Sequence, residues 1–152
     1  MANPKHLELL EKGPSAVDEW QSNNKGKMLD FSYADLCEKN LVGFNLQNAY
    51  FFTADLSYAN LSKTQLAKAN FACSRLQGVD FTDANLSGAC LCLSSLIYPI
   101  FSNTTLAKAN LLGATLHAPF VKGPQISLKG ARMQDTSLIE SAQCQNFQNL
   151  IQ

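Results

Sequence analysis

The sequence predicts an all-β solenoid, because two series of residues repeat at intervals of five. The first series runs from Phe31 to Ile126; all twenty of its positions are apolar, and eighteen of them are Leu or Phe. The second series lies two positions before the first. It consists mainly of small residues, with Ala recurring and Ser or Thr as substitutes, as at Thr64 and Ser74. The two series together mark most of the chain as one repetitive unit.

A period of five suits neither regular element. On an α-helix it moves each large residue by about 140° around the axis, and on a strand it places successive large residues on opposite faces. The chain must therefore turn once in every five residues for the large side chains to reach one interior. The small residues point inward too, because two side chains from each five-residue segment share a narrow, close-packed space.

The two series combine in the pattern A(D/N)LXX, which resembles the pentapeptide-repeat family over about residues 28–128, with a weaker continuation to about residue 140. The resemblance implies a right-handed quadrilateral β-helix, in which four repeats make one turn of about twenty residues. We expect about five such coils. The phenylalanines of the large series are expected to stack inside two faces, Phe31, Phe51 and Phe71 in one, and Phe81 and Phe101 in the other.

An α-helical cap is expected at the N-terminus, since an open end of a solenoid exposes unpaired backbone and apolar side chains. Asn3, followed by a proline, is typical of a helix start, and Gly13 of a helix end. Ser15 with Asp18 indicates a capping box that opens a second short helix through Trp20. The string HLELLEKG resembles the leader of cyanobacterial pentapeptide-repeat proteins.

These patterns divide the chain into an N-terminal helical cap over residues 1–27, a β-helix over 28–140, and a C-terminal cap or tail over 141–152. Near the C-terminal end, two prolines and a glycine interrupt the pattern, and an irregular corner is expected near 117–127. The large series then shifts by two positions. The shifted series is Leu128, Met133 and Leu138.

The charge balance excludes several classes of partner. Lys and Arg total 12 and Asp and Glu total 12, so the formal net charge is zero, whereas a nucleic-acid binder is expected to carry a basic excess. The opening stretch, MANPKHLELLEKG, alternates apolar with charged residues and has no apolar run long enough for a signal peptide or a membrane span. We therefore expect a cytoplasmic protein with no nucleic-acid or membrane partner.

No catalytic, cofactor-binding or metal-binding residue is expected. His6 and His117 are over a hundred residues apart and lack the spacing of metal ligands. Asp55 and Arg75 fall in one outward column and can pair. Short polar residues before the large series are expected to bond nearby backbone at the turns. These residues are Asp35, Asp55, Asn60, Asn70, Asp80, Asn85 and Asn110.

The five cysteines are odd in number and irregularly spaced, which favours free thiols in a reducing compartment. Cys90 and Cys92 flank the inward Leu91 and are expected to point outward. Cys73 falls one coil away from Cys92 and one residue aside, so a link between these two, or a reactive thiol, is one interpretation. The other is that small residues fit a tight wall.

Outward aromatic and apolar residues predict a protein-binding surface. On a grid of twenty residues they occupy two neighbouring faces and the next corner, while lysines lie mainly on the other faces. Clustered apolar residues indicate a contact surface; the alternative is that the wall tolerates them or that the termini cover them. The predicted partner-binding residues are Tyr50, Phe52, Tyr58, Leu93, Ile97, Tyr98, Ile100, Leu112 and Phe120.

The leading hypothesis is a non-catalytic scaffold that binds an unidentified protein, as a monomer rather than a dimer. One alternative is a regulator of a DNA topoisomerase that imitates duplex DNA, which the zero net charge disfavours. Another is a regulator of cell differentiation, as in some cyanobacterial members of the family. An enzyme is the least favoured, because Leu and Phe are expected to fill the interior.

Overall fold

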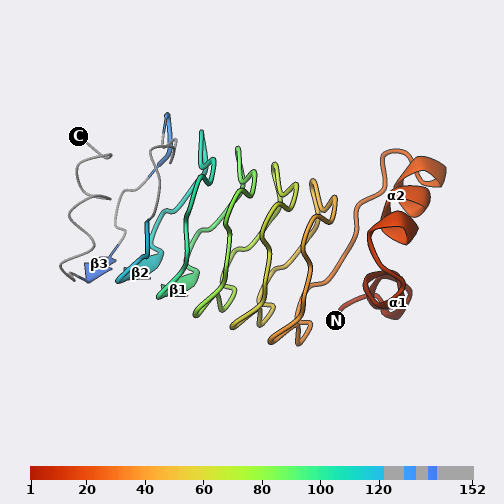
Figure 1. The fold of residues 1–152 in the computed structure, drawn as a ribbon, viewed down its shortest axis with the longest axis horizontal. Helices are drawn as coiled ribbons and strands as arrows, with labels where there is room; N and C mark the ends of the chain where they lie inside the picture. Colours follow the sequence, from red (N-terminus) through yellow and green to blue (C-terminus); the bar gives the residue numbers. More distant parts are fainter. Residues whose placement is uncertain (122–128, 133–136, 140–152) are drawn as a thin grey trace.

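The computed structural model describes residues 1–121, 129–132 and 137–139, which form two helices followed by a long stack of turns (Figure 1). Helix α1 spans Pro4–Lys12, and helix α2 spans Pro14–Asn23. Both helices lie at one end of the stack (Figure 1). The described chain is therefore a rod with helices at its N-terminal end.

Parallel backbone pairing between segments twenty residues apart builds the rod. Isolated bridges join Asp30 to Tyr50 at its start and Ile100 to Phe120 near its other end. Through most of the rod the pairing is limited to single bridges, and it lengthens into strands only late in the chain. The strands are β1 (Ser95–Ile97), β2 (Thr115–His117) and β3 (Ser137–Ile139), which form one sheet in the order β1-β2-β3.

Each pentapeptide contains a tight turn after its large residue. The amide of Ala34 donates to the carbonyl oxygen of Phe31 at 3.0 Å. The second residue after each large one has a positive φ, from Tyr33 to Ala118. These are features of a type II turn.

The residue before the large one supports the same turn with its side chain. Asp55 shows the pattern: its Oδ1 accepts the backbone N–H of Ser57 at 3.0 Å. This confirms the prediction from the sequence. All seven predicted residues make the bond: Asp35, Asp55, Asn60, Asn70, Asp80, Asn85 and Asn110.

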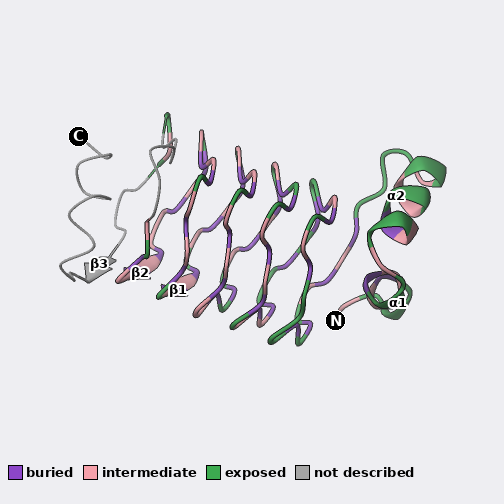
Figure 2. Ribbon diagram, in the orientation of Figure 1, coloured by how far each residue is buried: buried purple, intermediate pink, exposed green. Residues whose placement is uncertain are grey.

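Residues of the large and small series are buried in the interior of the rod, and buried segments alternate with exposed ones along the ribbon (Figure 2). From Phe31 to Leu116 every residue of the large series is at most 2% exposed. Ring centroids lie 4.8 Å apart for Phe51 and Phe71, with an interplanar angle of 4°. The second expected stack is present as well, with Phe81 and Phe101 at 5.7 Å. The periodicity therefore identified the core correctly.

Buried hydroxyl groups of the small series are satisfied by the backbone. The hydroxyl of Ser74 donates to the carbonyl oxygen of Phe71 at 2.6 Å, and that of Ser94 donates to Leu91 at 2.7 Å. Thr64 bonds the carbonyl oxygen of the large residue before it in the same way. These bonds offset the cost of burying a polar group, so Ser and Thr can replace Ala.

Helix α1 has the ends that the sequence predicts, but α2 does not. Asn3 is the N-cap of α1, with its side chain accepting from the amide of Lys5, and Gly13 is the C-cap. The predicted capping box at Ser15 is wrong: α2 begins at Pro14 with Gly13 as its N-cap, and it continues to Asn23. Proline has a φ suited to the first helical position, so the helix starts two residues earlier than a capping box at Ser15 would place it, and Ser15 lies inside its first turn.

Polar contacts join α1 to the first coil. The amide of Asn3 donates to the carbonyl oxygen of Asp30 at 3.1 Å, and the amide of Asp30 donates to Nδ1 of His6 at 2.9 Å. The Lys39 ammonium lies 2.6 Å from Oε1 of Glu11. Residue 39 belongs to the small series, so the lysine at this position turns outward to reach the helix.

The register changes after Val121. Leu116 in β2 pairs with Leu138 in β3, and Asn110 pairs with Arg132. These partners are two residues further apart than in the preceding coils, in agreement with the shift expected from the sequence. Most of the expected corner lies outside the described residues. So do Leu128, Met133 and the segment 141–152.

Candidate protein-binding surface

The turns place large apolar side chains on the outside of the rod in an unfavourable backbone conformation. Tyr33, Tyr58, Leu93 and Tyr98 have φ values of 62°, 60°, 56° and 54°. This left-handed conformation costs a non-glycine residue about 1 kcal/mol or more. Glycine takes the same position in other turns, as at Gly43. Turn formation alone therefore does not explain why tyrosine and leucine occupy these positions.

Six of the nine predicted partner-binding residues are exposed. Tyr58, Leu93 and Tyr98 are 57%, 66% and 56% exposed, and Tyr50, Phe52 and Phe120 range from 36% to 40%. The other three are half-buried, because neighbouring coils cover more of their side chains. These are Ile97, Ile100 and Leu112.

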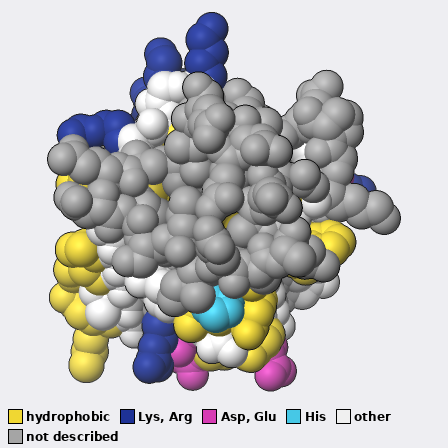
Figure 3. Space-filling view, turned by 90° about the vertical axis from the view of Figure 1, so that its left-hand side faces the viewer, with side chains coloured by type: hydrophobic (Ala, Val, Ile, Leu, Met, Phe, Trp, Pro, Cys, Tyr) yellow, Lys and Arg dark blue, Asp and Glu magenta, His cyan; other side chains and the backbone are white. Residues whose placement is uncertain are grey.

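Backbone pairing assigns the nine residues to three sides of the rod. Tyr50 lies in the column of bridges that continues through Asn70, Cys90 and Asn110, whereas Ile100 and Phe120 are bridged in another column. Tyr58 and Tyr98 belong to turns between these two columns, on the side that carries β1 and β2. In the view from the C-terminal end, hydrophobic side chains accordingly form separate groups at the visible rim (Figure 3).

Tyr58 is held in place by the next coil. Its hydroxyl accepts a hydrogen bond from Nε2 of Gln77 at 2.5 Å. Its ring lies against Gly78, where an added Cβ atom would approach Cδ1 of the ring to 2.6 Å. Leu93 lies against Gly113 in the same way, with Cδ2 at 2.7 Å from the position of an added Cβ. Small residues one coil further along thus leave room for these outward side chains.

Two further contacts order the surface. The rings of Tyr33 and Phe52 meet edge to face at 5.6 Å, and those of Tyr98 and His117 do so at 5.1 Å. Tyr33, His117 and the glycines beside Tyr58 and Leu93 were not among the predicted residues. Each of them lies about one coil from its contact partner in the sequence. This spacing could have identified them, because residues that are nineteen to twenty-one apart become neighbours.

A hollow of about 300 Å³ lies beside Tyr58. It is lined by Ser57, Arg75, Gln77, Ser95 and Ile97. Arg75 forms the expected pair with Asp55, at 3.5 Å between Nη1 and Oδ2. Because the arginine side chain is 76% exposed, this pair contributes under about 1 kcal/mol. The surface on this side therefore combines apolar, hydroxyl and cationic groups.

A family model described as pentapeptide repeats matches residues 30–66 and 59–96, with 8 copies of the repeat. These residues belong to the pentapeptide-repeat family. Membership implies the right-handed β-helix solenoid that the sequence predicts, and the family is generally a non-enzymatic scaffold fold.

Solved structures of pentapeptide-repeat proteins resemble the chain. One from the Arabidopsis thaliana thylakoid lumen is 26% identical, with 74% of this chain and 72% of that chain covered and a TM-score of 0.36. HetL from the cyanobacterium Nostoc, involved in heterocyst differentiation regulation, is 27% identical, with coverages of 80% and 54% and a TM-score of 0.38. One from the cyanobacterium Cyanothece is 25% identical, with coverages of 77% and 65% and a TM-score of 0.40.

The alignments span about half to two thirds of the two cyanobacterial proteins. Comparison with curated protein sequences gives no match. The fold assignment therefore rests on the family model and on the pairing within the chain.

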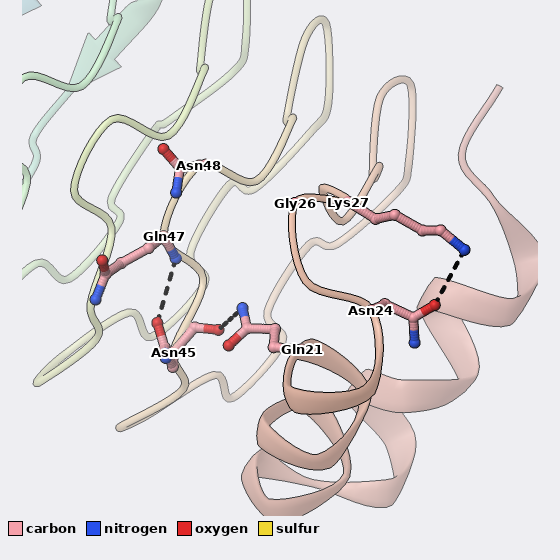
Figure 4. Close-up of a pocket in the computed structure, with 7 residues that line it drawn as sticks. All are labelled: Gln21, Asn24, Gly26, Lys27, Asn45, Gln47 and Asn48. Atoms are coloured by element: carbon pink, nitrogen blue, oxygen red, sulfur yellow. Dashed lines mark hydrogen bonds between the residues drawn. The ribbon is translucent and has the colours of Figure 1, made fainter.

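A second, polar hollow lies where α2 meets the pentapeptide-repeat stack (Figure 4). It has a volume of about 230 Å³. The Nε2 atom of Gln21 donates to the carbonyl oxygen of Asn45 at 3.0 Å, and Nζ of Lys27 donates to Oδ1 of Asn24 at 3.3 Å. The polar groups around the hollow thus bond one another, and they connect α2 to the first coil.

The described part of the pentapeptide-repeat chain holds no group of three or more His, Cys, Asp or Glu side chains placed to bind a metal ion. None of its helices has the length and apolar character needed to cross a membrane. His6 is 8% exposed, and burial lowers the pKa of its imidazole. Asp30 opposes this shift. The imidazole ring packs edge to face on Trp20 at 4.8 Å, so His6 has a structural role where the helices meet the first coil.

Proposed function

We propose that this chain is a non-catalytic scaffold that binds a partner protein through its outward aromatic and apolar residues. The observation that supports this most is the placement of Tyr58, Leu93 and Tyr98. Each is more than half exposed, and each has a positive φ that favours glycine over a large side chain. Polar residues such as Lys68 and Lys108 have a similar φ at this turn position, so the cost specific to these three is the exposure of apolar surface, which a contact with a partner would remove.

A binding surface keeps its geometry only if the structure that carries it is rigid. In this proposal the rod has about five coils over residues 28–140, and the helices within residues 1–27 close its N-terminal end. The bond from Asn3 to Asp30 and the ion pair of Glu11 with Lys39 support a fixed position for α1. A closed end prevents end-to-end growth of the rod.

The distribution of charge supports an apolar contact. Lys68 and Lys108 lie on turns of a side that carries none of the nine predicted residues, so a partner can approach the aromatic sides without meeting these two cations. Tyrosine is among the residues that contribute most to binding when they are buried at a protein interface.

Capture of proteins from the source cell with the immobilised chain, followed by mass spectrometry, tests the proposal. The test variant carries Tyr58→Ser, Leu93→Ser and Tyr98→Ser. The matched control carries Asn48→Ser, Lys68→Ser and Lys108→Ser, which are substitutions to serine at the same turn position, on the side that carries none of the nine predicted residues. We expect the control to retain a bound protein that the test variant loses. Equal capture by both variants would contradict the proposal.

We also propose that the chain acts as a monomer in the cytoplasm. Sedimentation of the purified chain measures its mass in solution, and a dimer that the Tyr58, Leu93 and Tyr98 variant dissociates would identify a second copy as the occupant of the surface.

Imitation of DNA is disfavoured by the zero net charge. Purified gyrase should therefore supercoil DNA at an unchanged rate when the chain is added.

A further inference from the structure

Two thiols meet on the outer wall of the rod. Cys90 and Cys92 flank Leu91, which is fully buried, and their Sγ atoms lie 3.0 Å apart. Both side chains are half-buried, and both cysteines are free. A disulfide bond has a length of about 2.05 Å, so the two sulfur atoms need to approach by only about 1 Å to bond.

The backbone on both sides of this pair is held by neighbouring coils. The amide of Cys90 donates to the carbonyl oxygen of Ala69 at 2.9 Å, and the amide of Leu91 donates to Asn110 at 2.7 Å. The carbonyl oxygen of Cys92 accepts from the amide of Cys73 at 2.9 Å. The backbone that carries the two thiols is therefore held in place.

Cys90 also departs from the pattern of its own column. The neighbours one coil away in each direction, Asn70 and Asn110, use Oδ1 to accept the backbone N–H two residues on, at 2.9 and 3.2 Å. Cysteine at this position gives up that bond, because a thiol sulfur is a weak acceptor. Its sulfur contacts the Cys92 sulfur, two residues further along.

Cys73, which the sequence placed near Cys92, is also a free thiol, and it is exposed. Its contact with Cys92 is through the backbone. Among the described cysteines, the thiol–thiol contact found is that of Cys90 with Cys92. The structure thus selects one pair among the alternatives that the sequence left open.

We propose that Cys90 and Cys92 form a reversible disulfide within the chain, with a low-molecular-weight disulfide such as oxidised glutathione as the oxidant. The Cys90 thiolate attacks one glutathione sulfur, which forms a mixed disulfide and releases the first glutathione as a thiolate. The Cys92 thiol then loses its proton and attacks Sγ of Cys90, which forms the Cys90–Cys92 bond and releases the second glutathione. The protein loses two protons and two electrons, and oxidised glutathione is reduced to two thiols.

The order of attack follows from the surroundings of Cys92. Burial, together with the adjacent Cys90, raises the pKa of the Cys92 thiol to about 11. Few Cys92 side chains are therefore ionised at neutral pH, so Cys92 is better suited to the second, intramolecular attack, in which proximity compensates for a low thiolate fraction. Closure of the mixed disulfide should accelerate as the pH rises, because more Cys92 side chains are then ionised.

The test uses the full chain and oxidised glutathione, with a metal chelator present. Trypsin cleaves after Arg75 and Lys108 and releases one peptide, residues 76–108, whose cysteines are Cys90 and Cys92 alone. Cys73 falls in the separate peptide 69–75. Oxidant is raised until the Cys73 peptide carries glutathione, and remaining thiols are then alkylated in denaturant before digestion.

We expect the 76–108 peptide to lose the mass of two hydrogen atoms, to resist alkylation, and to recover both thiols after treatment with dithiothreitol. The Cys92→Ser variant should instead retain glutathione on Cys90, whereas Cys73→Ser should leave closure unchanged. Two glutathione adducts, two alkylated thiols, or a disulfide to another chain at Cys90 or Cys92 of the wild-type protein would overturn the proposal.

Discussion

The ring of Tyr58 rests on Gly78, one coil further along the rod, where an added Cβ atom would lie 2.6 Å from Cδ1 of the ring. Gly78 also has a φ of 62°, a conformation that alanine adopts only with strain. The glycine therefore serves both the turn and the position of the tyrosine.

Replacing Gly78 with alanine should lower the free energy of unfolding and displace the Tyr58 ring. Gly43→Ala is the matched control, because its φ is also positive and an added Cβ would meet none of the described atoms within 4 Å. We expect the control to cost about 1 kcal/mol from backbone strain and Gly78→Ala to cost more, as measured by urea unfolding. Adding Tyr58→Ala should remove the difference between them; a difference that persists would contradict the contact.

Position within the repeat should decide the effect of a charge. Leu86 is fully buried and Leu93 is 66% exposed. Leu86→Arg should unfold the chain, because it places a charge where burial of leucine contributes about 1.5–3 kcal/mol, whereas Leu93→Arg should leave the melting temperature nearly unchanged. Circular dichroism during heating measures both. Similar melting of the two variants would show that the inward and outward positions are misassigned.

His6 should make stability depend on pH. Burial lowers its pKa from the ordinary value of 6.5, so between the lowered pKa and 6.5 the unfolded chain binds more protons than the folded chain. Stability is therefore full above 6.5 and is lost as the pH falls through this window. Urea unfolding across this range should show a smaller acid-induced loss for His6→Gln than for wild type. An acid-induced loss of the same size in His6→Gln and in wild type would contradict this role of His6.

Removing a side chain that bonds the backbone of a turn should lower the free energy of unfolding moderately. Asn70→Ala removes the bond from the amide of Ala72 to Oδ1, and we expect a decrease of about 1 kcal/mol in the free energy of unfolding. Thr105→Ala is the control, because Thr105 also precedes a large residue and its bridge to Asn85 is made by the backbone. Equal losses in the two variants would rule out a specific contribution from the Asn70 side chain.

The residues that face the interior of the rod could be predicted from the sequence, because their positions depend on local spacing. A period of five determines which residues face the interior, and the twenty residues per coil that the family resemblance implies determine which of them stack. The Phe31, Phe51 and Phe71 stack follows from that arithmetic. The same holds for the pairing of Asp55 with Arg75.

The start of α2 was mispredicted because two local signals compete. Ser15 with Asp18 indicates a capping box, but Pro14 already satisfies the first helical position. Choosing between these signals requires the path of the backbone at Gly13, which has a φ of 96°.

The sequence by itself determined the repeat, the core and the outward position of the aromatic residues, since each follows from a residue's place within five. Apart from the pairing of Asp55 with Arg75, the tertiary structure decided which outward side chains meet: Tyr58 with Gly78 and Gln77, and Cys90 with Cys92. An outward side chain can take several rotamers, and the coil beside it selects among them. The surface was therefore decided by contacts between coils, and the interior by the period.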